Sequence, residues 1–390
     1  MTSFTHTIQW QDGEMTKQAR WHSESGAAAP KRVVLADDTM TADSAYRLAC
    51  EGTALLWKGD FQNARQLLQA LARRCDRPPK KARPVKAVVE AGSAQLFNLH
   101  RQAQSQRARI LAMVLVPLSA DYTIPLRRAP DVALACNEAY GAASDSGDSV
   151  ISLRELQGLI GAHEWRKKGV PIPALGDSIH PHYGVFSPVR GEYIDLVATA
   201  ATTVLSENTA LGTLAFDIGT GTGVLAAVLA QRGVQRVIGT DQDPRALACA
   251  KENLQRLGLA HAVDLLATDL FPSGRAPLIV CNPPWLPARP SSPIEHAIFD
   301  PESRMLRGFI TGLSQHLVPK GEGWLLLSDL AEHLGLRSRA QLLEWIAAAG
   351  LTVLARSDIK PTHSKVSDDT DPLHAARAAE ITSLWRLVAA

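Results

Sequence analysis

The sequence has no long apolar run, and its cysteines form no recognisable pattern. The longest nearly unbroken apolar stretch, 110–118, is too short to cross a bilayer, and the polar N-terminal segment has no apolar region typical of a signal peptide. The five cysteines are scattered and lack CxxC spacing, which argues against a zinc site and a disulfide framework. We therefore expect a cytoplasmic protein with no membrane segment and no metal.

The sequence also has little net charge. Its 41 Lys and Arg against 39 Asp and Glu give a formal net charge of +2, which by itself argues against a dedicated polyanion binder. The charge is unevenly distributed, however, because residues 61–128 contain 13 Lys and Arg but three Asp and Glu. Such a segment could follow the phosphates of a nucleic acid, and a solvated face with a basic loop explains it equally well.

Length and composition indicate two domains, since 390 residues exceed what one hydrophobic core usually fills. Residues 1–40 begin with a long polar stretch and are expected to be loosely ordered. Residues 41–168 show mainly helical patterns, which predict a mainly helical, partly basic substrate-recognition domain. The Pro- and Gly-rich stretch 169–184 predicts a linker, and 185–390 then form the second domain.

The second domain alternates short apolar runs with helical patterns. Runs rich in Val, Ile and Leu between helices are typical of a parallel sheet covered on both faces. The last two runs are joined without a clear helical pattern, so we expect them to pair antiparallel. The fold class is therefore α/β, with a doubly wound, Rossmann-like sheet of seven strands. The predicted strands are 213–219, 236–241, 262–269, 277–282, 323–329, 351–359 and 380–388.

A glycine-rich turn follows the first of these strands, in "DIGTGTG" (217–223). Asp217 ends the strand, and Gly219, Gly221 and Gly223 allow a tight turn with positive φ and close approach of a ligand to the helix N-terminus. The dinucleotide fingerprint GxGxxG is not completed, because no third glycine follows at the required position. A nicotinamide or flavin cofactor is thereby disfavoured.

Carboxylates follow the next two strands. Asp241 ends the second strand about twenty residues past the glycines, where it can accept hydrogen bonds from two ribose hydroxyls. Asp243 precedes a proline and fits the N-cap of the following helix better. Asp269 follows the third strand at the same edge of the sheet, within reach of an adenine amino group.

The fourth strand runs into "NPPW", residues 282–285. Pro283 and Pro284 fix φ and restrict the preceding backbone, so the Asn282 amide has little freedom. The Asn282 oxygen can accept a hydrogen bond from a planar NH2 group, and Trp285 offers a face on which a flat group can stack. The four residues therefore predict a catalytic corner for a planar nitrogen nucleophile.

Together these segments resemble the class I S-adenosylmethionine-dependent methyltransferases, in which "NPPW" matches the (N/D)PP(Y/F/W) signature of N-methyltransferases. The resemblance implies S-adenosylmethionine as the cofactor and transfer of its methyl group to a planar nitrogen. It implies that the cofactor is bound by Asp217, Gly219, Thr220, Gly221, Gly223, Asp241, Asp269 and Asn282.

Two branches of that superfamily compete for the substrate. The segment "GVFSPVRGE" (184–192) is similar to the lead-in of the rRNA guanine-N2 methyltransferases and to a segment of the release-factor glutamine methyltransferases. Both place it against the cofactor, which makes Phe186, Arg190 and Glu192 candidate pocket residues. The first branch implies a degenerate α/β domain before the catalytic one and the second a shorter helical domain. We rank rRNA or another nucleic acid first and a protein glutamine second; a non-catalytic cofactor-binding assembly protein is a third interpretation.

Overall fold

The computed structural model describes residues 7–77, 94–143, 147–189, 191–290, 295, 297–362 and 368–390. The chain divides into two compact units, Met1–Val88 with Asn98–Glu164 and Val89–Phe97 with Trp165–Ala390. Part of the basic segment and Arg190 lie outside the described residues. Among the described helices, none has the length and apolar character needed to cross a bilayer.

The first unit is built on a six-stranded sheet with the order β1-β2-β6-β5-β4-β3. The three strands β3, β4 and β5 are parallel, β1 and β2 form an antiparallel hairpin, and β6 pairs parallel with β2 and antiparallel with β5. The strands are β1 (Thr7–Asp12), β2 (Met15–His22), β3 (Arg32–Ala36), β4 (Thr53–Trp57), β5 (Val114–Leu118) and β6 (Ser149–Ser152). The helices are α1 (Ala42–Cys50), α2 (Phe61–Cys75), α3 (Ala94–Leu111), α4 (Ala133–Tyr140) and α5 (Leu153–Lys168).

The prediction of a loosely ordered stretch 1–40 followed by a mainly helical domain is wrong in its architecture. Helices do occupy most of 41–168, but they accompany a sheet, and β1, β2 and β3 lie within the stretch predicted to be loose. The hairpin strands are polar, with Ile8 and Trp21 as their buried residues, so they show little apolar alternation. The fully buried strand β4 is too short for its apolar run to be distinguished from a helix by periodicity.

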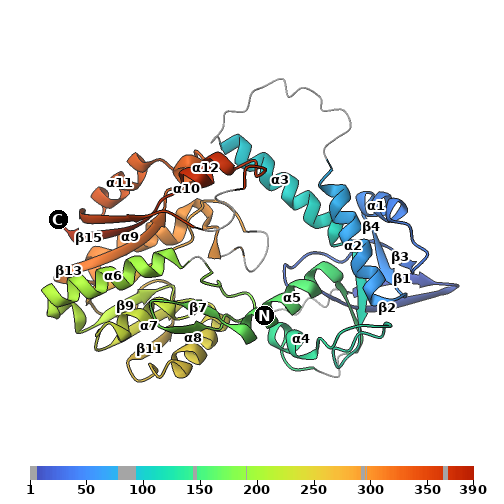
Figure 1. The fold of residues 1–390 in the computed structure, drawn as a ribbon, viewed down its shortest axis with the longest axis horizontal. Coiled ribbons are helices and arrows are strands. Elements are labelled where there is room, and N and C mark those ends of the chain that lie inside the picture. The colour runs from blue at the N-terminus through green and yellow to red at the C-terminus, as the bar shows by residue number, and fades with distance from the viewer. Residues whose placement is uncertain are drawn as a thin grey trace. The chain divides into compact units, whose positions relative to one another are not determined.

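The second unit contains the predicted sheet, with the order β11-β10-β9-β12-β13-β15-β14. Figure 1 labels β9, β11, β13 and β15 of this sheet. All neighbouring strands are parallel except β15, which is antiparallel to both β13 and β14, as predicted for the final pair. The fold class and the seven strands are therefore confirmed. The strands are β9 (Ala215–Ile218), β10 (Val237–Asp241), β11 (Val263–Ala267), β12 (Ala276–Cys281), β13 (Leu317–Ser328), β14 (Leu351–Ile359) and β15 (Thr382–Ala389).

Helices cover both faces of this sheet. Along β12, Leu278 and Val280 join one apolar cluster and Ile279 and Cys281 the other, because successive side chains of a strand point to opposite faces. The first cluster includes α6 (Glu192–Glu207), α7 (Val224–Gln231) and α8 (Pro244–Arg256), and the second includes α9 (Arg304–His316) and α11 (Arg339–Ala348). Shorter helices are η1 (Thr209–Gly212), η3 (Pro301–Ser303), α10 (Leu330–His333) and α12 (His374–Ala379).

The segment predicted to be a linker, 169–184, is instead part of the second unit. It forms an antiparallel pair of short strands, β7 (Val170–Ile172) and β8 (Asp177–Ile179). Val170, Ile172 and Ile179 are buried in the same cluster as α6 and α7. Proline and glycine here make a tight hairpin that packs on the core, so composition alone misled the prediction.

Candidate active site

The three predicted motifs begin in one row across the sheet. Ile218 of β9 pairs with Thr240 of β10 on one side and with Cys281 of β12 on the other. The next residue in each chain segment is Gly219, Asp241 and Asn282. Because neighbouring strands lie roughly 5 Å apart, these residues start within about 10 Å of one another at the carboxyl edge of the sheet.

The glycine loop connects β9 to α7 through three residues in the left-handed region. Gly219, Gly221 and Gly223 have φ of 72°, 55° and 80°. A Cβ on Gly219 would lie 2.4 Å from Cε of Met305, and one on Gly223 would lie 3.1 Å from Cβ of Ala250. The left-handed conformation therefore favours glycine at all three positions, as the sequence predicted, and the space beside Gly219 and Gly223 is tight.

Asp217 braces this loop from inside the sheet. Its side chain is 1% exposed, and its Oδ2 accepts hydrogen bonds from the Thr220 hydroxyl at 2.7 Å and from the Ala226 backbone N–H at 3.1 Å. Burial raises its pKa to about 6, although both hydrogen bonds act in the opposite direction. These contacts give Asp217 a supporting position, and the predicted direct contact with a cofactor stays a prediction.

Asp241 lies against the opposite side of the loop. Its Oδ2 accepts a hydrogen bond from the Gly221 N–H at 3.1 Å, and its Oδ1 accepts one from the Asp243 N–H at 2.9 Å. Burial raises the pKa of its carboxyl group. Asp243 caps α8 by accepting from the Arg245 N–H at 2.8 Å, in agreement with its predicted structural role.

Asp269 lies beyond β11 at the same edge, and it is exposed. Its carboxylate forms an ion pair with Arg304 at the start of α9 and accepts a weaker hydrogen bond from Gln242 at 3.4 Å. The predicted contact with an adenine amino group would compete with Arg304 for the same oxygens. Asp269 is thus near the site but already engaged.

The NPPW corner contains a hydrogen bond that the sequence did not reveal. The Trp285 indole Nε1–H donates to Oδ1 of Asn282 at 2.9 Å, and both side chains are partly buried. The Trp285 ring also packs against the apolar cluster of α9 and α11. Trp285 therefore contacts Asn282 through the edge of its ring. The sequence had predicted that the face of the ring stacks on the substrate. Pro283 is buried and Pro284 partly buried between Asn282 and Trp285.

The segment before α6 provides two of its three candidate residues. Phe186 is partly buried and packs against the cluster of α6 and α7. Glu192, the first residue of α6, accepts hydrogen bonds from the Thr362 backbone N–H at 2.7 Å and from its hydroxyl at 3.3 Å. Arg190 lies outside the described residues, so its predicted role stays untested.

Sequence reasoning missed Asn253, a buried residue of α8 that is 1% exposed. Its Nδ2 donates to the backbone carbonyls of Thr222 at 3.1 Å and His180 at 3.3 Å, and its Oδ1 accepts from the His180 N–H at 2.8 Å. Asn253 therefore connects the glycine loop to the segment after β8. Neither periodicity nor any motif marks an asparagine in the buried face of a helix.

We expect replacement of Asn253 by leucine to lower the free energy of unfolding by about 3 kcal/mol, since three buried backbone groups lose their partner. Urea denaturation followed by circular dichroism measures this loss. Asn208→Leu, at an exposed asparagine of the same unit, is the matched control and should change stability by less than about 0.5 kcal/mol. Equal stability of the two variants would contradict the bracing role.

The two histidines that follow β8, His180 and His182, make structural contacts. His180 Nδ1 lies 2.6 Å from the Arg166 carbonyl oxygen, and His182 Nε2 lies 2.8 Å from Oε2 of Glu252. Arg166 also donates to Glu252 at 2.6 Å. Within the described residues there is no group of three or more His, Cys, Asp or Glu arranged to hold a metal ion.

Asp300 positions the start of α9, beside the glycine loop. Its carboxylate oxygens accept from the backbone N–H groups of Met305 at 3.0 Å and Leu306 at 3.1 Å. Pro301 and Glu302 form a separate 3-10 turn in which Glu302 has a φ of 59°, so α9 begins at Arg304. The buried carboxylate ahead of that turn places Met305 beneath Gly219.

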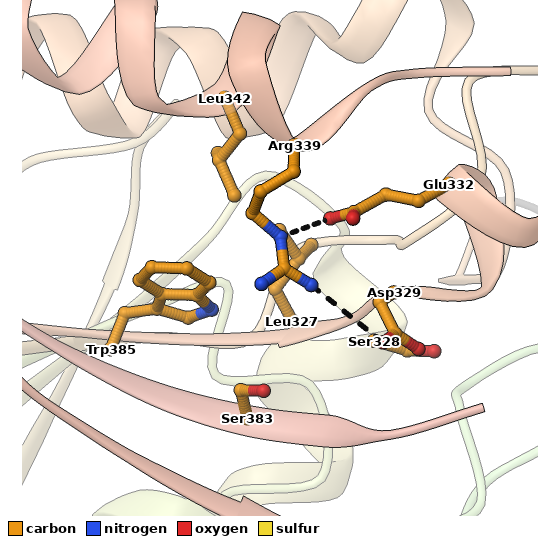
Figure 2. Close-up of a pocket in the computed structure, with 8 residues that line it drawn as sticks. All are labelled: Leu327, Ser328, Asp329, Glu332, Arg339, Leu342, Ser383 and Trp385. Carbon is orange, nitrogen blue, oxygen red and sulfur yellow. Dashed lines mark hydrogen bonds and ion pairs between the residues drawn. The ribbon is translucent and has the colours of Figure 1, made fainter. Parts of the chain in front are cut away.

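A small pocket lies at the end of β13 (Figure 2). Arg339 of α11 donates to Glu332 at 2.7 Å and forms an ion pair with Asp329 at 3.6 Å, and its guanidinium lies 5.3 Å from the centre of the Trp385 ring. The lining contains none of the predicted site residues. These contacts attach α11 to the sheet, and we assign them a structural role.

Residues 177–331 match the sequence profile described as the methyltransferase small domain. The matched residues contain the glycine loop, Asp241, Asp269 and the NPPW corner. This part of the chain is similar to the methyltransferase small domain. The predicted resemblance to this class of methyltransferases is thereby confirmed.

Curated relatives of the chain carry two different names. The chain is 34% identical over 161 residues to release factor glutamine methyltransferase of Cereibacter sphaeroides. This match covers 36% of the chain and 55% of the relative. It is 36% identical over 146 residues to ribosomal protein L11 methyltransferase of Geobacter metallireducens, covering 34% of this chain and 47% of the relative. The chain thus spans about half the length of these relatives.

Among solved structures, the chain resembles a ribosomal protein L11 methylase from Lactobacillus delbrueckii subsp. bulgaricus. The match has 16% sequence identity and a TM-score of 0.36, and it covers 55% of this chain and 86% of that one.

Proposed function

We propose that the protein is an S-adenosylmethionine-dependent N-methyltransferase that transfers a methyl group to a planar exocyclic or amide nitrogen. The observation that carries this proposal is the common row of Gly219, Asp241 and Asn282 at the carboxyl edge of the sheet. Ligands of open α/β sheets bind at this edge. In this row the glycine loop, the Asp241 carboxylate and the Asn282 amide start close to one another.

The residues of the row fit the predicted cofactor. The left-handed glycines leave the loop without side chains where a nucleoside could approach, and Asp241 presents a carboxylate beside Gly221. We propose that Asp241 accepts hydrogen bonds from the ribose hydroxyls and that Asp217 keeps the loop in shape. When bound, S-adenosylmethionine supplies a methyl group activated by a sulfonium.

The protein's contribution to the chemistry is alignment of the nucleophile. The lone pair of an amide or exocyclic amine is delocalised, and we propose that Oδ1 of Asn282 and the Pro283 carbonyl accept hydrogen bonds from its N–H groups. These acceptors turn the lone pair toward the methyl group and stabilise the positive charge that develops on nitrogen. No general base is needed before transfer, since the proton is lost from a cationic product.

We propose a nucleic acid, with rRNA as the first candidate, as the substrate, bound in part by the first unit. Three arginines of the basic segment have acidic partners, because Arg74, Arg107 and Arg128 pair with Asp43, Asp76 and Asp60. Five other arginines are exposed there and could contact phosphates. They are Arg65, Arg73, Arg77, Arg109 and Arg127.

Two further features of the first unit favour this substrate. Helix α3 contains no Asp or Glu in eighteen residues, and its middle, residues 102–106, is exposed. The α/β architecture also agrees with the resemblance to the rRNA enzymes, which implied an α/β domain before the catalytic one, and disagrees with the helical domain implied by the glutamine enzymes.

A protein substrate is the second candidate, and the names of the relatives favour it. Release factor glutamine methyltransferase and ribosomal protein L11 methyltransferase are both named for protein acceptors. A glutamine amide is planar and would meet Asn282 as a nucleobase amine would. The chemistry of the row therefore suits either acceptor, and our preference for a nucleic acid rests on the first unit.

The deciding experiment is incubation of the purified protein with labelled S-adenosylmethionine and fractionated extract of a strain that lacks the gene. Label in rRNA supports the first candidate, and label in a release factor or ribosomal protein supports the second. Label in neither macromolecule, with an intact cofactor affinity, would contradict the proposed reaction. The same fractions from the wild-type strain, already modified, are the control.

Binding to rRNA should depend steeply on salt. If four exposed arginines contact phosphates, the affinity should fall about a hundredfold between 50 and 200 mM salt. Replacing Arg73 and Arg77 with glutamine should reduce the slope, whereas Arg47→Gln, at an arginine near Glu51 outside the basic segment, should leave it unchanged. An affinity that is indifferent to salt would remove the nucleic acid from consideration.

Cofactor affinity should depend on pH through Asp217. Burial raises its pKa to about 6, so it loses its negative charge at a higher pH than an ordinary aspartate. Because a sulfonium is attracted by the ionised form, the affinity for S-adenosylmethionine should fall severalfold as the pH is lowered from 8 to 5. Calorimetry measures this, and S-adenosylhomocysteine, which lacks the positive charge, should show a smaller change. Identical profiles for the two ligands would contradict the attribution.

A further inference from the structure

The hydrogen bond inside the NPPW corner restricts the Asn282 amide. An indole N–H can donate but not accept, so the group that faces Trp285 must be the amide oxygen and not the NH2 group. Rotation of the amide by 180° would place two donors against each other. The bond therefore selects one of the two orientations of Asn282.

The orientation matters because Asn282 has chemically different ends. A carbonyl oxygen has two lone pairs, and Trp285 occupies one of them at 2.9 Å. The other remains as an acceptor for a substrate N–H. A flipped amide would instead offer an NH2 group, which repels the N–H groups of the nucleophile. The Trp285 ring is held in turn by its packing on the apolar cluster of α9 and α11.

We propose that Trp285 is a positioning residue that fixes the acceptor end of Asn282 toward the substrate, and that it is not the stacking platform for the substrate's plane. The inference rests on the proposed function, in which Asn282 accepts from the nucleophile. A phenylalanine at this position would keep an aromatic face but could not donate the bond. Tryptophan thus has a role here that its aromatic face alone does not provide.

Trp285→Phe separates the two roles, because it keeps a ring and removes the donor. With a positioning role, Trp285→Phe should lower kcat about tenfold or more, close to the loss in Trp285→Leu, with little change in cofactor affinity. With a stacking role, Trp285→Phe should behave like the wild type and only Trp285→Leu should be impaired. Thermal unfolding of both variants checks that they are folded.

Asn282→Asp supplies a second, independent comparison. The two oxygens of a carboxylate are equivalent, so an aspartate needs no partner to select its orientation. Adding Trp285→Phe to Asn282→Asp should therefore cost much less in kcat than adding it to the wild type. An equal cost in both backgrounds would overturn the inference, even if Asn282→Asp alone is slower than the wild type.

The indole N–H can also be observed without any substrate. In a ¹H–¹⁵N spectrum, the Trp285 indole signal, identified by its loss in Trp285→Phe, should move when Asn282 is replaced by alanine. The Trp324 indole, which donates to Oε2 of Glu322 at 2.9 Å in the same unit, should not move. An unmoved Trp285 signal would overturn the inference while leaving the proposed function intact. Failure of the wild type to methylate any fraction would overturn the proposed function, and the catalytic part of the inference with it.

Discussion

Replacement of Asn282 by alanine should lower kcat for methyl transfer by about two to three orders of magnitude, with the affinity for S-adenosylmethionine changed less than about threefold. The variant removes the acceptor that, in the proposed mechanism, orients the nucleophile and stabilises its developing charge. It leaves the glycine loop and Asp241 in place, since neither bonds to the Asn282 side chain in the structure. Single-turnover transfer and calorimetric cofactor binding measure the two quantities.

Asn282→Asp is the matched comparison, because it keeps an acceptor oxygen at the same position. It should retain much more activity than Asn282→Ala. Parallel loss of transfer and cofactor affinity in the alanine variant would show that the corner only supports the fold. Equal activity of the aspartate and alanine variants would show that the acceptor oxygen is not used.

The second large effect is expected at Asp241. Replacement by alanine should weaken S-adenosylmethionine binding about a hundredfold, because the two proposed charge-assisted hydrogen bonds from the ribose and the bond from the Gly221 N–H are lost together. At saturating cofactor the transfer rate should recover most of its wild-type value. The measurements are the dissociation constant by calorimetry and kcat over a wide range of cofactor concentration.

Asp243→Ala tests whether that effect is specific to Asp241. Asp243 lies two residues away and caps α8, so its loss should cost about 1 kcal/mol of stability. Its effect on cofactor affinity should be small. A comparable loss of affinity in both variants would mean that the acidic pair acts only through the start of α8.

The second unit could be predicted well because its strands are buried on both faces and appear as apolar runs with charged or glycine-rich ends. Asp241 and Asn282 were placed together from the rule that parallel strands end at one edge, and the register across Ile218 confirms it. The fold of the first unit could not be predicted, since its hairpin strands are polar. In addition, the single apolar stretch 110–118 contains both the end of α3 and the strand β5.

Side-chain hydrogen bonds within the site could not be predicted from the sequence. Asn253 and Asp300 act through backbone groups that are distant in the chain or depend on turn geometry, so spacing carries no sign of them. The bond from Trp285 to Asn282 depends on how the two prolines turn the backbone. The sequence suggested which residues gather at the rim, and the structure was needed to show which of them hold others in place.

The position of β15 has a consequence for synthesis of the protein. It lies between β13 and β14 although it follows both in the chain, so the sheet stays divided until β15 has left the ribosome. Until then β13 has an open edge beside buried residues such as Leu325 and Leu327. An exposed apolar edge invites pairing with other chains. A released chain that ends before Thr382 should therefore require chaperone protection, whereas one that contains β15 should not.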